Sequence, residues 1–147
     1  MRLERGNLMI RELKTNAECK EAYPVMSQLR VNLSEEDYLG LLEPMKKQGY
    51  RLLALYDENQ IKGLAGIIEL TNFYNEKHIY VYDLVTDGAS RSKGYGEKLL
   101  HHIEELAKES GCGMISLSSG NQRKDAHRFY EEKMGFDRVS HVFNKKL

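Results

Sequence analysis

The sequence lacks an excess of charge of either sign, a long apolar run and a cysteine cluster. Lys and Arg number 22 and Asp and Glu also number 22, so no global basic field favours non-specific nucleic-acid binding. The longest apolar stretches, such as 64–68, are far too short to span a bilayer. The first residues include Arg2, Glu4 and Arg5 but no signal-peptide apolar region. We therefore expect a cytoplasmic protein with neither a nucleic-acid nor a membrane partner.

The two cysteines, Cys19 and Cys112, are far apart in the sequence. They form neither a zinc-type cluster nor a disulfide framework, and no two histidines have the i, i+4 spacing of a helical metal site. We therefore predict no metal site and interpret both cysteines as packing residues. A chain of 147 residues with 41% apolar and 30% charged residues suits one folded core.

Hydrophobic periodicity predicts a single domain over 9–147, preceded by a loose lead-in over 1–8. The predicted order of elements is β-α-α-β-β-β-α-β-α-β. Strands are expected at 9–13, 50–56, 61–70, 79–86, 114–118 and 136–145, and helices at 15–22, 34–49, 95–108 and 124–134. The fold class is therefore α+β, with a mixed, mostly antiparallel central sheet flanked by helices.

Two helix starts carry capping signals. Thr15 and Glu18 have the spacing of a capping box, and Ser34 precedes three acidic residues as a typical N-cap. Pro24 is expected to kink or restart the first helix, because proline lacks the backbone N–H that the helix needs.

The segment 91–96, Arg-Ser-Lys-Gly-Tyr-Gly, follows a strand and opens the most strongly periodic helix. The first turn of a helix has free N–H groups and a partial positive charge, which together bind phosphate. Gly94 and Gly96 allow close approach of the backbone, and Arg91 and Lys93 add cationic side chains. This pattern predicts a diphosphate-binding turn.

Two other phosphate motifs do not fit the same residues. A dinucleotide fingerprint needs a third glycine where Leu99 stands, and a nucleotide-hydrolase loop needs Gly-Lys followed by Ser or Thr. Gly96 is followed by Glu97 instead. The structural alternative is that the two glycines only allow a tight turn between the strand and the helix.

A second segment, 125–130, reads Asp-Ala-His-Arg-Phe-Tyr and is followed by Gly-Phe. Alone, its aromatic residues are compatible with a packed amphipathic helix. Together with 91–96, it resembles the GNAT superfamily of GCN5-related N-acetyltransferases from about Met9 onward. The matching positions are Arg91, Gly94, Gly96, Ala126, Tyr130, Gly135 and Phe136.

The resemblance implies acetyl-CoA as cofactor. It places the pyrophosphate on the backbone of Arg91, Ser92, Lys93, Gly94, Tyr95 and Gly96. The pantetheine arm is expected along the backbone of Leu84 and Thr86, and the hydroxyl of Tyr130 is expected to face the CoA sulfur as an acid. Many members have asparagine where Arg123 stands, so Asn121, Gln122 and Arg123 remain alternatives for that cofactor contact.

An amine must lose a proton before it attacks a thioester, because its pKa near ten keeps it protonated at neutral pH. Asp83 and Glu69, on predicted neighbouring strands, are the two candidate bases. Strict alternation puts Asp83 on the opposite face from Tyr82 and Leu84.

The predicted function is acetyl transfer from acetyl-CoA to a primary amine of a small molecule in a ternary complex. The alternative is a non-catalytic CoA-binding or assembly module of the same fold. A local resemblance over 123–147 to the aminoalkylphosphonate N-acetyltransferase branch favours an acceptor with an anionic group. A homodimer paired through the terminal strands is compatible with the sequence.

Overall fold

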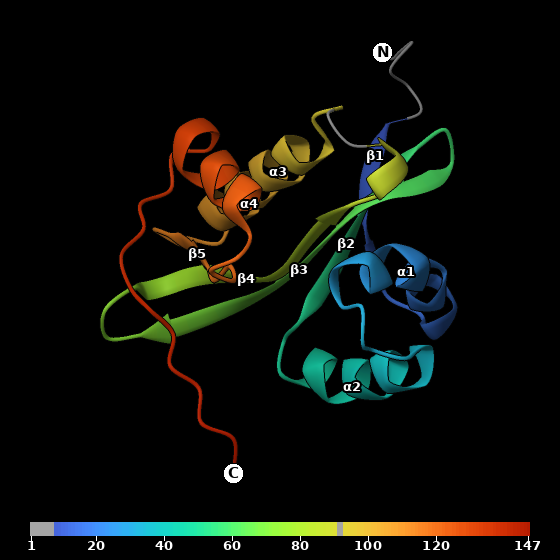
Figure 1. The fold of residues 1–147 in the computed structure, drawn as a ribbon, viewed down its shortest axis with the longest axis horizontal. Helices are drawn as coiled ribbons and strands as arrows, with labels where there is room; N and C mark the ends of the chain where they lie inside the picture. Colours follow the sequence, from blue (N-terminus) through green and yellow to red (C-terminus); the bar gives the residue numbers. More distant parts are fainter. Residues whose placement is uncertain (1–7, 91–92) are drawn as a thin grey trace. The chain divides into compact units, whose positions relative to one another are not determined.

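A computed structural model describes residues 8–90 and 93–147 (Figure 1). Arg91 and Ser92, which the sequence assigns to the cofactor turn, lie outside the described residues. Internal contacts divide the chain into two compact units, one up to Ser116 and the other from Leu117 to Leu147. The single domain over 9–147 stays a prediction.

The first unit is built on a sheet whose strands follow one another in chain order. They are β1 (Met9–Leu13), β2 (Arg51–Asp57), β3 (Gln60–Asn72), β4 (Glu76–Thr86) and β5 (Ile115–Leu117). The first four pair antiparallel. Ile79 N donates to Met114 O at 3.0 Å and Gly113 N to Lys77 O at 3.2 Å, so contacts advance in the same direction along both segments. This progression is that of a parallel pair. The α+β class and the mostly antiparallel sheet are confirmed.

Local signals define the first two helices, α1 (Asn16–Leu29) and α2 (Glu35–Lys47). The capping box of Thr15 and Glu18 is present, and the Ser34 side chain accepts a hydrogen bond from Asp37 N. Pro24 lies inside α1, which continues to Leu29 instead of stopping at 22. Proline removes one helical bond, but buried residues on either side of it keep the helix packed. No helix in the described ranges is long and apolar enough to cross a membrane.

Helices cover both faces of the sheet in this unit (Figure 1). α1 and α2 enclose a core cluster with β-strand residues that include Leu64. α3 (Tyr95–Glu109) packs on the other face of the sheet. There, a Cβ added to Gly63, the residue before Leu64, would lie 3.0 Å from Leu99 Cδ1. Consecutive strand residues face opposite sides of a sheet, so Leu64 faces α1 and α2 while Gly63 faces α3.

The second unit contains α4 (Lys124–Arg128) and a π-helical turn, η3 (Phe129–Lys133), which together account for the predicted last helix. The predicted terminal strand over 136–145 is wrong, because no helix or strand is assigned to 136–147. A strand needs a neighbour for its backbone hydrogen bonds, and here the apolar Val139, Val142 and Phe143 are exposed. The terminal strand through which two copies would pair in the predicted homodimer is therefore not present in 136–147.

Candidate functional site

A β-bulge interrupts β4 at Tyr82. Gly66 of β3 lies opposite Asp83, but the next residue, Ile67, lies opposite Val81, so Tyr82 is the extra residue. The Tyr82 ring stacks on Tyr50 with centroids 5.9 Å apart, and Tyr50 contacts Asp83 as well. The expected separation of Tyr82 and Asp83 on opposite faces is therefore wrong, because the bulge shifts the alternation by one residue.

Asp83 is the centre of a buried polar cluster on the face covered by α1 and α2. Its Oδ1 accepts hydrogen bonds from Arg30 Nε at 3.0 Å and Arg30 Nη2 at 2.8 Å, and its Oδ2 accepts one from the Tyr50 hydroxyl at 2.7 Å. Arg30 Nη2 also donates to the carbonyl of Tyr82 at 2.8 Å. A carboxylate has about four acceptor sites, so one remains for a water molecule or an amine.

Tyr50 holds this cluster in place. Burial, and then the adjacent Asp83 carboxylate, raise the pKa of Tyr50 well above its usual value, so the hydroxyl stays a donor. A Cβ on Gly66 would lie 1.8 Å from Tyr50 Oη and 2.7 Å from Asp83 Oδ2. Glycine at 66 therefore provides the space that the hydrogen bond between Tyr50 and Asp83 needs.

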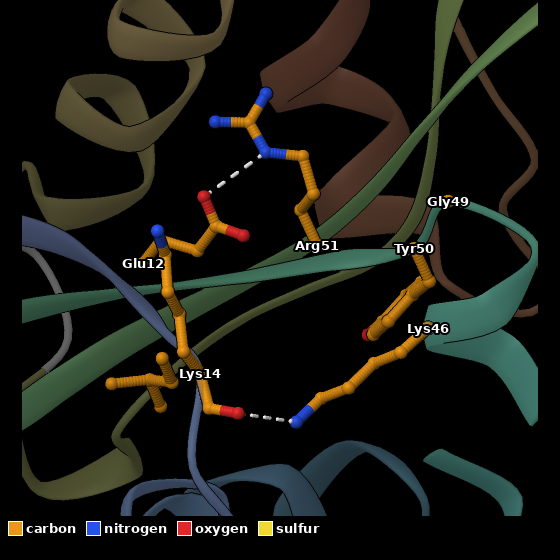
Figure 2. A pocket seen from close by; sticks show the side chains of 7 residues that line it. Glu12, Lys14, Lys46, Gly49, Tyr50 and Arg51 are labelled. Carbon is orange, nitrogen blue, oxygen red and sulfur yellow. Dashed lines mark hydrogen bonds and ion pairs between the residues drawn. The ribbon is translucent and has the colours of Figure 1, made fainter. Parts of the chain in front are cut away.

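Tyr50 also lines a pocket of about 270 Å³ between the end of β1 and the start of β2 (Figure 2). Lys46 reaches along its edge to the carbonyl of Lys14 at 2.9 Å, and Arg51 pairs with Glu12 at 3.1 Å. Asp83 is not one of the residues that line it. The pocket and the carboxylate cluster are separate features that share Tyr50.

The structure does not bring Glu69 to Asp83. Glu69 has the same parity as Gly63 along β3, so it lies on the face that α3 covers. Its carboxylate is exposed, 3.8 Å from Lys77 Nζ and 3.8 Å from Cys112 Sγ. Burial raises the pKa of the Cys112 thiol, and the charge of Glu69 adds to that shift. The two candidate bases lie on opposite faces.

Leu84 and Thr86 are partly buried and pair with Ala65 and Gly63 on β3. The contact with the segment of β5 advances from Lys77 and Gly113 to Ile79 and Met114, and β5 ends three residues after Met114. A parallel pairing that continues from these residues ends before Leu84, because β5 is too short. The outer backbone edge of β4 at 84–86 therefore has no partner in β5.

At the start of α3, Gly94 adopts a backbone conformation that favours glycine. Gly94 is the N-cap of α3, with φ of +78°, and a Cβ there would meet only Lys98 Nζ, at 4.0 Å. Among the described residues, the space beside Gly94 is therefore open, with the ammonium group of Lys98 at its edge. Lys93 is exposed next to this turn. Sequence reasoning missed Lys98, although its position one helical turn after Gly94 was a usable signal.

The Tyr95 side chain contacts the end of β2. It is buried, and its hydroxyl donates a hydrogen bond to Asp57. This hydrogen bond is the main reason why the pKa of Tyr95 is raised to about 12. Tyr95 can therefore contribute only its backbone to an anion at the turn, and its ring anchors the start of α3.

Gln28, at the end of α1, contacts the turn that follows β4. Its Nε2 donates to Asp87 Oδ1 at 2.9 Å, and its Oε1 accepts from Gly88 N at 2.7 Å. No motif pointed to Gln28 or Arg30, because their partners are more than fifty residues away along the chain. The described residues contain no group of three or more His, Cys, Asp and Glu that could hold a metal ion.

Tyr130 belongs to the second unit, in the π-helical turn. It is buried, and its ring lies 5.6 Å from that of Phe129 and 5.7 Å from that of Phe136. Burial raises the pKa of the Tyr130 hydroxyl, and an interaction with Arg123 opposes that shift. The three alternatives for the cofactor contact, Asn121, Gln122 and Arg123, are all exposed.

Comparison with known proteins identifies the family of this chain. The model of the acetyltransferase (GNAT) family matches residues 16–136. The N-acetyltransferase YhdJ of Bacillus subtilis strain 168, itself uncharacterised, is 44% identical over 139 residues, covering 94% of this chain and 98% of the relative. The aminoalkylphosphonate N-acetyltransferase of Salmonella typhimurium strain LT2 is 34% identical over 67 residues, 46% of this chain and 43% of that one.

The fold is also that of a solved acetyltransferase. The aminoglycoside N-acetyltransferase AAC(6')-Iy, solved in complex with CoA, superposes with a TM-score of 0.83 over 99% of this chain and 98% of its own, at 12% sequence identity. The predicted acetyltransferase is thus confirmed by the family match and the full-length relative. The chain belongs to the acetyltransferase (GNAT) family.

Proposed function

We propose that this enzyme transfers the acetyl group of acetyl-CoA to the primary amine of a small molecule by direct attack in a ternary complex. The amine nitrogen forms a bond to the thioester carbon, the carbon–sulfur bond breaks, and CoA leaves. The amine loses one proton and the departing thiolate gains one. The observation that carries the proposal is the glycine-capped start of α3 with Lys98 next to it, together with the outer backbone edge of β4 at 84–86, which has no partner in β5.

The residues present fit acetyl-CoA, which supplies an activated acyl group when bound. In our proposal, the backbone of 91–96 binds the pyrophosphate, with Gly94 giving the close approach and Lys98 adding positive charge. The free backbone edge at Leu84 and Thr86 bonds the pantetheine amides. Asn121 remains our proposed side-chain contact to the cofactor.

Asp83 is our first candidate for the group that takes the proton of the amine. It is buried on the face of α1 and α2, it has one acceptor site left, and the exposed ring of Tyr82 lies on the same face. Glu69 is the second candidate and would serve an acceptor bound on the α3 face. The two residues can be separated by mutation, because they do not contact one another.

Tyr130 is the proposed acid for the CoA sulfur. Its raised pKa keeps the phenol protonated at neutral pH, which suits a group that gives a proton or a hydrogen bond to a leaving thiolate. The match with the family motif at Ala126 and Tyr130 supports this role.

The acceptor class is proposed from the local similarity to the aminoalkylphosphonate N-acetyltransferase, together with Arg30. The Arg30 side chain is 46% exposed while it pairs with Asp83, so a cation is accessible beside the proposed amine site. We infer that the acceptor is a small amine that carries an anionic group.

A turnover screen tests the function. The purified protein is incubated with acetyl-CoA and single acceptors: aminoalkylphosphonates, amino acids, polyamines, aminoglycosides and peptide N-termini. Release of CoA thiol is measured against an acceptor-free control. The proposal expects amine-dependent release, greatest for the acceptors with an anionic group. A protein that binds CoA but releases none with any of these amines would contradict it.

A further inference from the structure

The end of α1 is attached to β4 and to the turn after it by two side chains. Gln28 and Arg30 make five hydrogen bonds to residues between 82 and 88, with lengths of 2.7–3.0 Å. We call this pair the α1 brace. Neither the motifs nor the resemblance assigns a role to these two residues.

Arg30 holds one end of the segment. Its guanidinium bonds both the Tyr82 carbonyl and the Asp83 carboxylate, at the bulge where the regular ladder with β3 is interrupted. A bulged residue lacks its regular ladder partner. A rigid, bidentate donor is therefore well suited to hold the chain in this shape.

Gln28 holds the other end. A side-chain amide can donate and accept at the same time, and Gln28 does both, with Asp87 and with the N–H of Gly88. Asp87 N also donates to Lys62 O at 2.8 Å, and Asp87 O accepts from Ser90 N at 2.9 Å. Gln28 thus joins a turn that is already tied to β3.

The segment between the two attachments contains Leu84 and Thr86, whose outer backbone edge has no partner in β5. Free backbone groups bind a ligand well only when their direction is set in advance. The α1 brace contacts both ends of this segment from outside the sheet.

We propose that Gln28 and Arg30 are positioning residues for acetyl-CoA, acting through the backbone of 82–88 without touching the cofactor. This inference rests on the proposed function, which places the pantetheine arm along 84–86. It assigns α1 a role on the cofactor side of the enzyme in addition to the face that it covers.

The test uses Gln28→Leu in the 147-residue chain. Gln28 is exposed, so the fold is expected to survive. Loss of two hydrogen bonds should weaken CoA binding by about three- to tenfold, measured by calorimetry with CoA alone. Gln28→Glu, which puts a carboxylate beside Asp87, should weaken CoA binding at least as much. Gln48→Leu is the matched control, since Gln48 is an exposed glutamine at the end of α2.

Arg30→Lys tests the other attachment. Lysine keeps the charge beside Asp83 but cannot reproduce the bidentate geometry. The affinity for CoA, measured by calorimetry with CoA alone, should fall about threefold or more. A residue that only stabilised the fold would lower the Tm and leave the affinity of the folded protein for CoA unchanged.

The outcomes separate the two proposals. A wild-type protein that does not bind CoA overturns the proposed function and this inference with it. A wild-type protein that binds CoA, with Gln28→Leu and Arg30→Lys binding as tightly as Gln48→Leu, overturns the inference alone. A loss of CoA affinity in Gln28→Leu with an unchanged Tm supports it.

Discussion

The phenol of Tyr95 donates a hydrogen bond of 2.5 Å to Asp57 Oδ2, which ties the first residue of α3 to the end of β2. These residues are 38 positions apart in the sequence. The contact secures the helix start whose N–H groups face the proposed pyrophosphate site. It therefore connects the stability of the fold with the geometry of the cofactor turn.

Tyr95→Phe should remove this hydrogen bond and keep the ring. We expect a loss of about 1–2 kcal/mol in the free energy of unfolding, since the acceptor is charged, and a loss of a few fold in CoA affinity. Folding raises the pKa of Tyr95 from 10.0 to about 12, so the folded state favours the protonated phenol. The advantage of the wild type over Tyr95→Phe should be complete below pH 10 and disappear between pH 10 and about 12. Urea denaturation of both proteins across this range checks it, and a constant difference would contradict the assignment.

Gly94→Asp should lower CoA affinity by about tenfold or more, or about 1.4 kcal/mol. The change forces an L-residue to adopt φ of +78° and puts a negative charge where the diphosphate is proposed to bind. Gly94→Asn is the control, because asparagine tolerates this conformation and brings no charge. Calorimetric titration with CoA measures both. Equal affinities for Asp and Asn would remove the electrostatic part of the proposal.

Asp83→Asn should lower turnover at neutral pH while acetyl-CoA still binds. The loss should shrink as the pH rises, because the free amine then becomes populated without a base. Steady-state rates between pH 6 and 10 provide the test. Tyr50→Phe is the control that removes one hydrogen bond from Asp83 and keeps the carboxylate. A pH-independent loss would show that Asp83 positions other groups, and a loss confined to Glu69→Gln would transfer the base to that residue.

Tyr130→Phe should lower turnover by about 10- to 1000-fold, in the lower part of that range because CoA is a tolerable leaving group. The ring contacts with Phe129 and Phe136 are kept, so stability and CoA binding should change little. Single-turnover rates at saturating acetyl-CoA and amine measure the chemical step. Rates within twofold of the wild type, with chemistry limiting, would leave Tyr130 a packing residue.

Sequence reasoning succeeded where a few neighbouring residues decide the structure. The capping box of Thr15 and Glu18 and the N-cap Ser34 involve contacts three residues apart, and both are present. The glycine-capped start of α3 has the same local origin. It gave the first helix too short, because α1 continues through Pro24 to Leu29, where packing of buried residues on both sides of the proline outweighs the loss of one helical bond.

The sequence by itself determined the family, through the resemblance of two short motifs, and the class of fold, because helix caps and hydrophobic periodicity act over short distances; the residues of the cofactor turn stay a prediction. Only the tertiary structure decided the surroundings of Asp83. The bulge at Tyr82 arises from pairing with β3, and the partner Arg30 is 53 residues away. Such contacts depend on which elements pack together, and a short pattern does not record that. The same reason explains the terminal segment, whose apolar residues predict a strand but have no neighbouring strand to complete it.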